Sequence, residues 1–324
     1  MDGELVLLIP RGGPRSGFDT LPALITDAGE RARTRFLEFF TATIRNKNTR
    51  AAYVRAVGQF CEWCEKRGLQ LESVTPVAVA AYIEQHTASK PTVKQHLAAI
   101  RMLFDYLVTG GVLPFNPATS VKGPTYVVKK GKTPVLSAED ARRLLDSIDP
   151  SSLVGLRDRA LIGVMVYSFA RVSAVVAMRV EDYYQNGKRW WVRLHEKGGK
   201  FHEMPVHHKA EEYLDAYLAA AGIATDKKGS LFRSAYRRTG KLTGRSMSRW
   251  DTFKMIKRRA RTAGVSDRIG CHTFRATGIT VYLQNGGSLE AAQQMANHES
   301  IRTTKLYDRT GEQVTLDEVE RIVL

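Results

Sequence analysis

Histidine, arginine and tyrosine side chains gather near the C-terminus in a pattern that could cleave a phosphodiester. The segment HTFR contains His272 and Arg275, NHES contains His298, and TTKLYDR contains Tyr307. Cleavage without a metal requires a nucleophile, cations beside the non-bridging oxygens, an acid for the leaving oxygen and a base for the nucleophile's proton. Tyrosine suits the first role when the bond must be resealed, because a phosphotyrosyl ester conserves the bond energy.

Two cationic residues upstream could fill the remaining roles. Arg171 follows an apolar helical run in FARVSAVV, where a guanidinium would be costly to bury unless it met an anion. Arginine suits phosphate because its planar fork stays charged and binds two oxygens at once. Lys197, in HEKGGK, is predicted at a hairpin tip, from which it could donate a proton to the departing sugar oxygen. Lys200 competes with it for that role.

Each of these residues could also have a purely structural role. Before a helix, His272 could be a cap or a core residue, and Tyr307 could simply pack. His298 could be a cation at a helix C-terminus, and Arg171 could pair with an acid. Their joint occurrence favours the catalytic interpretation.

Apolar residues at spacings of three and four predict helices through the first half of the chain. A stretch rich in Gly, Pro and Asp, residues 1–30, precedes them and indicates a flexible or loosely packed arm. Four consecutive helical segments predict a small bundle over residues 31–121. Residues 122–135 contain four lysines, two prolines and no acid, which predicts a basic linker suited to a phosphate backbone.

The second domain, residues 136–324, is predicted to be mainly α with one small antiparallel sheet. Ser137 is a good N-cap for a first helix, and GLRDRALIGVMVYSFA indicates a long apolar helix. The segments KRWWVRLHE and KFHEMPVHH, separated by a glycine-containing turn, predict a hairpin. The other segments are helical, and the last, VTLDEVERIVL, predicts a short C-terminal tail helix. Because β and α segments do not alternate regularly, a Rossmann-type fold is disfavoured.

Charge and cysteine content limit the partners and the compartment. The 49 Lys and Arg against 33 Asp and Glu give a net charge of +16, which favours a nucleic-acid partner. The apolar run LVLLIP is too short for a membrane span or a signal segment, so we expect a cytoplasmic protein with no membrane partner. Cys61 and Cys64 lie within a helical pattern, which indicates core packing rather than half of a zinc site. No metal site is expected.

Taken together, the candidate residues resemble the active site of the tyrosine recombinase (phage integrase) family. The resemblance rests on their identity and order along the chain: Arg171, Lys197, His272, Arg275, His298 and, nine positions later, Tyr307. It covers the chain from LSAED to the C-terminus. It extends more weakly to SKPTVKQHLAAIRMLF, which resembles the helical core-binding, SAM-like DNA-binding domain of these enzymes.

The resemblance implies a role for each residue. Arg171 and Arg275 would hold the scissile phosphate, and Tyr307 would form a 3′-phosphotyrosyl link. Lys197 would be the general acid, and His272 a general acid or base.

The implied enzyme is a site-specific recombinase or integrase that cleaves and rejoins DNA strands. Its two domains would form a C-shaped clamp around double-stranded DNA. A homo-tetramer would synapse two specific recombination sites and exchange strands through a Holliday junction, without a metal or other cofactor. Within the active site, His298 would hydrogen-bond the scissile phosphate or assist Arg275.

Two departures from the family pattern leave alternatives open. The family usually has an acid three residues after its first arginine, where this chain has Ala174, so the support of that arginine is in question. The family also commonly has Leu-Gly-His where residues 296–298 are Ala-Asn-His. A type IB-like topoisomerase and a DNA-binding regulator with a degenerate active site are the alternative functions.

Basic clusters and one face of the bundle are candidates for DNA contact. Phosphate contacts would position the protein, and side chains on a groove-facing helix would read bases. The candidates in the bundle and in the second domain are Lys47, Arg50, Lys94, Gln95, Arg101, Lys241, Arg245, Arg249, Lys257 and Arg258.

Overall fold

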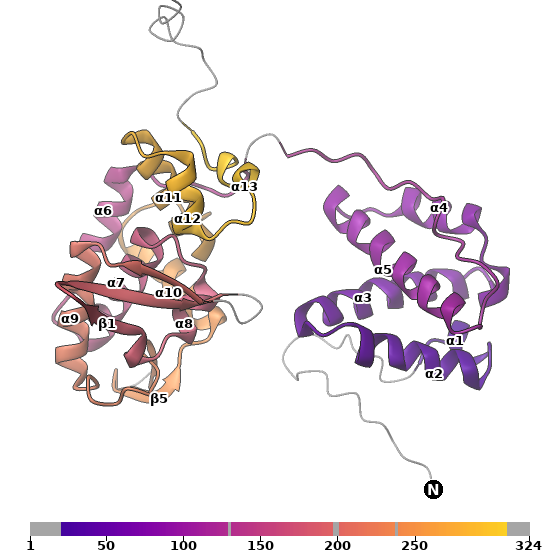
Figure 1. Ribbon diagram of the computed structural model, residues 1–324, viewed down its shortest axis with the longest axis horizontal. Coiled ribbons are helices and arrows are strands. Elements are labelled where there is room, and N and C mark those ends of the chain that lie inside the picture. The colour runs from indigo at the N-terminus through magenta and orange to yellow at the C-terminus, as the bar shows by residue number, and fades with distance from the viewer. Residues whose placement is uncertain (1–20, 129–130, 197–200, 237–238, 310–324) are drawn as a thin grey trace, which may run out of the picture. The chain divides into compact units, whose positions relative to one another are not determined.

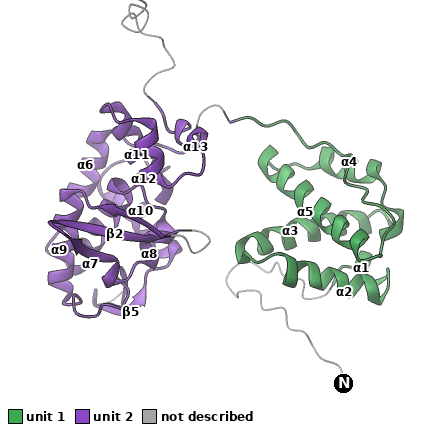
Figure 2. Ribbon diagram, viewed as in Figure 1, with its two compact units in different colours: residues 1–127 green, residues 128–324 purple. Residues whose placement is uncertain are grey.

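The computed structural model describes residues 21–128, 131–196, 201–236 and 239–309 (Figure 1). Contacts divide the chain into two compact units, residues 1–127 and 128–324 (Figure 2). The finer boundaries predicted from the sequence, at residues 31, 122 and 136, remain predictions. None of the helices in the described part of the chain has both the length and the apolar character needed to cross a membrane.

The first unit is entirely helical in its described residues. Asn46 caps the 19-residue helix α3 (Lys47–Glu65), because its side-chain oxygen accepts from the backbone N–H groups of Asn48 and Thr49. Thr75 caps the next long helix, which has proline at its first position. The elements are α1 (Ala23–Thr26), α2 (Glu30–Glu38), a π-helical turn (Phe39–Thr43), α3 (Lys47–Glu65), a 3-10 turn (Leu71–Ser73), α4 (Pro76–Gln85) and α5 (Lys90–Thr109).

The core of this unit consists of aromatic and aliphatic side chains from α2 to α5. Phe60 of α3 lies edge-on to Phe104 of α5, with ring centroids 6.0 Å apart. Cys61 and Cys64 are buried in the same core, so their interpretation as packing residues is confirmed. Burial raises the pKa of the Cys64 thiol to about 12, so it stays protonated and apolar.

The predicted arm differs from the structure after residue 20. Leu24 and Ile25, on α1, are buried in the core of the first unit. The backbone N–H of Leu24 also donates to Glu65 Oε1 at 3.0 Å. The apolar segment LPALI therefore packs as part of the bundle, despite the glycines and prolines around it. Residues 1–20 lie outside the described part of the chain.

The second unit is built around α7, which is buried on most of its surface. Its core side chains, among them Leu161 and Met165, are fully buried, because α9 and α11 pack against it. The helical elements of this unit are α6 (Ala138–Asp146), α7 (Leu153–Tyr167), α8 (Val172–Ala177), a 3-10 turn (Val180–Asp182), α9 (His208–Ala221), α10 (Arg249–Thr262), α11 (Cys271–Gln284), α12 (Leu289–Ala296) and α13 (Ile301–Lys305). The tail helix predicted over VTLDEVERIVL lies outside the described residues.

Two small antiparallel sheets lie in the second unit. The three-stranded sheet has the order β1-β2-β3, with β1 (Tyr183–Asn186), β2 (Arg189–His195) and β3 (Phe201–Pro205). The β2–β3 pairing confirms the predicted hairpin. The second sheet, formed by β4 (Arg233–Ala235) and β5 (Leu242–Ser246), corrects the prediction of a single sheet. A strand of three residues is too short to give a period-two signal in the sequence.

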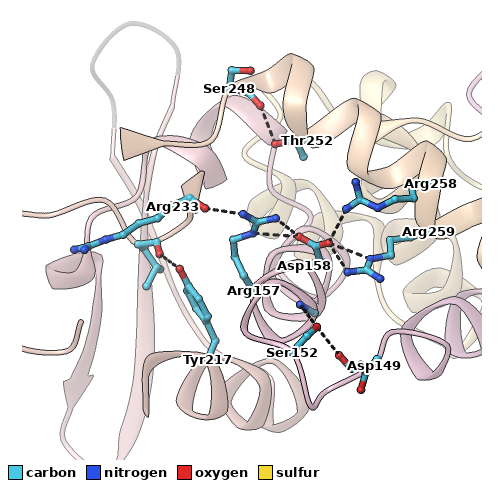
Figure 3. Close-up of polar contacts among 12 residues, drawn as sticks. Asp149, Ser152, Arg157, Asp158, Tyr217, Arg233, Ser248, Thr252, Arg258 and Arg259 are labelled. Atoms are coloured by element: carbon cyan, nitrogen blue, oxygen red, sulfur yellow. Dashed lines mark hydrogen bonds and ion pairs between the residues drawn. The ribbon is translucent and has the colours of Figure 1, made fainter. Parts of the chain in front are cut away.

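A buried carboxylate joins three elements of the second unit (Figure 3). Asp158 of α7 is fully buried and accepts from Arg157 Nη2 at 2.6 Å. It also accepts from Arg259 of α10, at 2.7 Å from Nη2, and from Arg258 at 3.3 Å. Arg157 donates in addition to the backbone carbonyl of Arg233 in β4, at 2.8 Å. We call these residues the Asp158 cluster; it ties α10 and β4 to the central helix.

Candidate active site

The C-terminal candidates predicted from the sequence meet beside α11. That helix carries His272 and Arg275 on its first two turns, α12 packs against it, and α13 packs against α12 (Figure 1). Asn297 ends α12 in the left-handed region at φ 46°, which turns the chain so that His298 and then Tyr307 come back to the start of α11. His272 Nε2 and the Tyr307 hydroxyl are 2.6 Å apart.

Tyr307 is held on several sides. Its ring stacks on that of His298, with centroids 5.7 Å apart and an interplanar angle of 9°. Its backbone carbonyl accepts from the Thr280 hydroxyl of α11 at 2.8 Å. The side chain is 8% exposed, so the hydroxyl has few conformations to search before it could react.

Arg275 is buried without a carboxylate in contact among the described residues. Nη1 donates to the carbonyl of Phe169, and Nη2 donates to that of Ala296 at 2.6 Å. Nε has no hydrogen-bond partner in the described part of the chain. Burial, and then the positive charge of Arg171, lowers the pKa of Arg275 to about 10. In the described part of the chain this buried cation hydrogen-bonds neutral groups and has no ion pair, so it can receive an anion.

The approach of α11 to the end of α7 depends on a glycine. A Cβ at Gly278 would lie 2.2 Å from the carbonyl oxygen of Val166 and 2.8 Å from the Phe169 ring. Phe169 itself has φ 53°, an uncommon conformation for an aromatic residue. The close approach and the unusual turn together present the Phe169 carbonyl to Arg275.

Both site histidines are electrostatically biased toward the neutral form. Burial, and then the charges of Arg275 and Arg171, lowers the pKa of His272 below its usual range. The same three causes and His272 lower the pKa of His298 to about 3. His298 Nδ1 lies 2.9 Å from the Thr304 hydroxyl, which fixes its ring. A neutral His272 with its proton on Nδ1 can accept the phenolic proton of Tyr307 at Nε2.

Arg171 completes the described part of the site together with an unexpected acid. It is the N-cap residue of α8, and its Nη1 donates to Glu196 Oε2 at 2.7 Å. Its side chain is 39% exposed, whereas that of Glu196 is 5% exposed. The anion that the sequence required for Arg171 is therefore a carboxylate at the end of β2. Lys197 and its competitor Lys200 lie outside the described residues.

Comparison with known proteins decides the family. The phage integrase family matches residues 134–313, more than half of the chain. The chain belongs to the phage integrase family. It is a tyrosine site-specific recombinase, an enzyme that cleaves and rejoins DNA, and the family and activity expected from the sequence are confirmed. The N-terminal SAM-like domain of phage integrases matches residues 34–111.

The relatives of the recombinase are similar over most of its length. Tyrosine recombinase XerD of Listeria monocytogenes serotype 4b (strain F2365) is 28% identical over 268 residues, which cover 80% of this chain and 87% of the relative. Tyrosine recombinase XerD of Pseudomonas aeruginosa is 29% identical over 267 residues, covering 80% and 86%.

Two solved structures share the fold. The XerH recombinase bound to a palindromic difH substrate, a post-cleavage complex, has a TM-score of 0.69 at 17% identity, covering 94% of this chain and 98% of the other. A lambda integrase tetramer bound to a Holliday junction has a TM-score of 0.64 at 17% identity, covering 87% and 79%.

The predicted DNA-contact residues of the first unit fall into two groups. Lys47, Lys94 and Gln95 are exposed. By contrast, Arg50 donates to the carbonyl of Ile44 at 2.8 and 3.1 Å, and Arg101 donates to the carbonyls of Ala118 and Val121. Both arginines therefore have a structural function within the unit, and contact of all five residues with DNA stays a prediction.

In the second unit, the predicted contact residues lie directly before β5, on β5 and on α10. Three of them, Lys241, Arg245 and Arg249, are exposed. Lys257 is partly buried, with its ammonium over the Phe253 ring at 5.2 Å. Arg258 is 57% exposed although it reaches Asp158, so most of its surface remains open to a ligand.

The sequence interpretation missed two features of this unit. One is Glu196; the other is the exposed Trp250, which stacks on Phe253 at 5.6 Å, on the face of α10 that carries Lys254 and Lys257. Aromatic and basic residues at spacings of three and four could have revealed that face.

Two histidines of the hairpin, His195 and His202, have hydrogen-bond partners within the protein. His195 Nε2 lies 2.9 Å from Asp182 Oδ2, and His202 Nε2 lies 3.1 Å from the carbonyl of Met295. No cluster of three or more His, Cys, Asp or Glu residues in the described part of the chain could hold a metal ion.

Proposed function

We propose that the recombinase binds double-stranded DNA at specific recombination sites and cleaves one strand with Tyr307. The tyrosine oxygen attacks phosphorus, its proton passes to His272, and the bond to the 5′ oxygen breaks. Lys197 supplies the proton for that oxygen, and the 3′ end stays linked to Tyr307. Rejoining is the reverse reaction on a new 5′ hydroxyl.

The hydrogen bond between His272 and Tyr307, beside a buried arginine that lacks an anion, supports this proposal best. This hydrogen bond connects the nucleophile, Tyr307, to His272, which can act as a base because its lowered pKa keeps the imidazole neutral. Arg275 and Arg171 would bind the non-bridging oxygens of the scissile phosphate, where negative charge grows during attack. His298 would support the same phosphate.

We further propose that the two units close on DNA as a C-shaped clamp, joined by the basic linker 122–135. A homo-tetramer would synapse two sites and exchange strands through a Holliday junction. The shared fold with a lambda integrase tetramer bound to a Holliday junction supports this arrangement. A DNA substrate of this kind places the enzyme in the cytoplasm, at the nucleoid.

A nicked suicide substrate tests the chemistry. Once the short strand beyond the nick diffuses away, rejoining stops and a covalent protein–DNA adduct accumulates. We expect the wild type to form the adduct and Tyr307→Phe to form none, while half-site binding stays unchanged, because only the nucleophilic oxygen is removed. Tyr282→Phe, in the same domain, is the matched control and should behave as wild type.

Two results would contradict the assignment. Adduct formation by Tyr307→Phe would mean that another residue is the nucleophile. Site-specific binding by the wild type without any adduct would favour a DNA-binding regulator instead.

A further inference from the structure

We propose that Glu196 positions Arg171 for the scissile phosphate and is the acid that residue 174 does not provide. Ala174, on α8, is fully buried and carries no carboxylate. Glu196 lies 25 residues from Arg171 along the chain but bonds it directly, at 2.7 Å. The inference rests on the proposed function, because it assigns a role to a contact inside that site.

The strand places this carboxylate precisely enough for the role. Side chains two apart lie on the same face of a strand, so Val192 and Leu194 share one face of β2, and Glu196 follows directly after the strand ends at His195. Val192 and Leu194 are buried in the same core as Val175 of α8. The strand that leads to Glu196 is therefore anchored in the core, and the Glu196 side chain is itself only 5% exposed.

Burial of the Glu196 carboxylate costs desolvation free energy, which suggests that its charge has a function. A carboxylate that is 5% exposed loses most of its hydration, and one hydrogen bond to a guanidinium replaces only part of it. Arg171, by contrast, is 39% exposed and would have many rotamers without a partner. In this pair Glu196 loses hydration, and in return the side chain of Arg171 is held in one conformation.

The geometry leaves Arg171 able to bind phosphate. Glu196 accepts from Nη1, and a guanidinium has further N–H groups on its other edges. Glu196 also offsets part of the repulsion between the two site arginines: Arg171 lowers the pKa of Arg275, and Glu196 raises it.

The charge of Glu196 predicts opposite effects on binding and on chemistry. Its removal takes a negative charge away from the phosphate site, so the half-site affinity of Glu196→Gln should equal or exceed that of the wild type. Adduct formation at saturating protein should nevertheless slow by about tenfold to 100-fold, because Arg171 is no longer held in place. Glu196→Asp, which keeps the charge but shortens the side chain, should be intermediate.

Glu203→Gln is the matched control. Glu203 lies on β3 of the same hairpin and pairs with Arg193 at 2.6 Å, with 42% of its side chain exposed. We expect its rate to stay within about twofold of the wild type. Normal half-site binding by each variant, measured by gel shift, shows that it is folded.

A double-mutant cycle tests whether Glu196 acts through Arg171. If it does, Arg171→Ala and Arg171→Ala with Glu196→Gln should form adduct at the same slow rate. A further loss in the double variant, or an undiminished rate for Glu196→Gln alone, would overturn the proposal. Absence of adduct in the wild type would instead overturn the proposed function, so the two failures are distinguishable.

Discussion

Two arginine clusters in the second unit differ in what compensates their charge. In the Asp158 cluster, Arg157 and Arg259 both donate to one fully buried carboxylate. At the active site, Arg275 donates to two backbone carbonyls, and its Nε has no partner in the described part of the chain. The carboxylate of Asp158 pairs with the arginines of the first cluster, which therefore connects α7, α10 and β4 without needing a ligand. At the active site a single carboxylate, that of Glu196, accepts from Arg171, and Arg275 has no ion pair in the described part of the chain, which leaves its positive charge available to a phosphate.

Removal of the central carboxylate should give the largest effect on stability. Asp158→Asn leaves the buried Arg157 and the partly buried Arg259 without the carboxylate to which both donate, and we expect the free energy of unfolding of the second unit to fall by about 3–5 kcal/mol. Chemical denaturation followed by circular dichroism, fitted with a transition for each unit, measures this.

The control for that change is an exposed acid in the same unit. Asp146 is 60% exposed and lies 3.8 Å from Arg159, so Asp146→Asn should lower the free energy of unfolding by less than about 1 kcal/mol. Equal effects of the two substitutions would show that burial of Asp158 does not matter, and the comparison of the clusters would fail.

Arg275→Lys should affect activity far more than stability. A lysine keeps the charge but carries its donors on one nitrogen, so it cannot span the two carbonyls and the phosphate that the separate nitrogens of a guanidinium can reach. We expect adduct formation to fall by about 100-fold to 1,000-fold, with half-site binding nearly normal. Single-turnover cleavage of the nicked substrate gives the rate. A wild-type rate would mean that Arg275 does not contact the phosphate.

The pH dependence of cleavage should reflect the positive charges of Arg275 and Arg171 beside His272. Because burial and the two arginines lower the pKa of His272, the imidazole stays neutral at pH values where an ordinary histidine, with a pKa of about 6.5, is half protonated. Adduct formation should therefore persist as the pH falls through about 6.5 and be lost only below it. Rates measured at saturating protein between about pH 5 and pH 8 test this, and a midpoint at or above 6.5 would contradict it.

Sequence reasoning found the parts of the site that are local or ordered along the chain. His272 and Arg275 share one helix, and the hairpin was visible in the aromatic and β-branched residues of KRWWVRLHE and the glycine-containing turn that follows them. The partners that link distant segments were not visible. Glu196 meets Arg171 only because β2 packs beside α8, and Asp158 meets Arg259 across 101 residues.

Composition also misled in one place. Glycine and proline around residues 21–29 suggested a loose arm, although Leu24 and Ile25 are core residues. Local composition describes the average of a segment, whereas two apolar side chains are enough to dock a short helix when a bundle offers a surface.

The close contact at Gly278 makes the active site sensitive to mutation at a position that takes no part in the chemistry. Every missense change of a glycine codon adds at least one carbon atom, and here that atom would lie 2.2 Å from a backbone oxygen of α7. The displacement would act on the turn at Phe169 and so on Arg275, without touching DNA or the nucleophile. Inactivating alleles should therefore arise at codon 278 as readily as at the codons of the reacting residues.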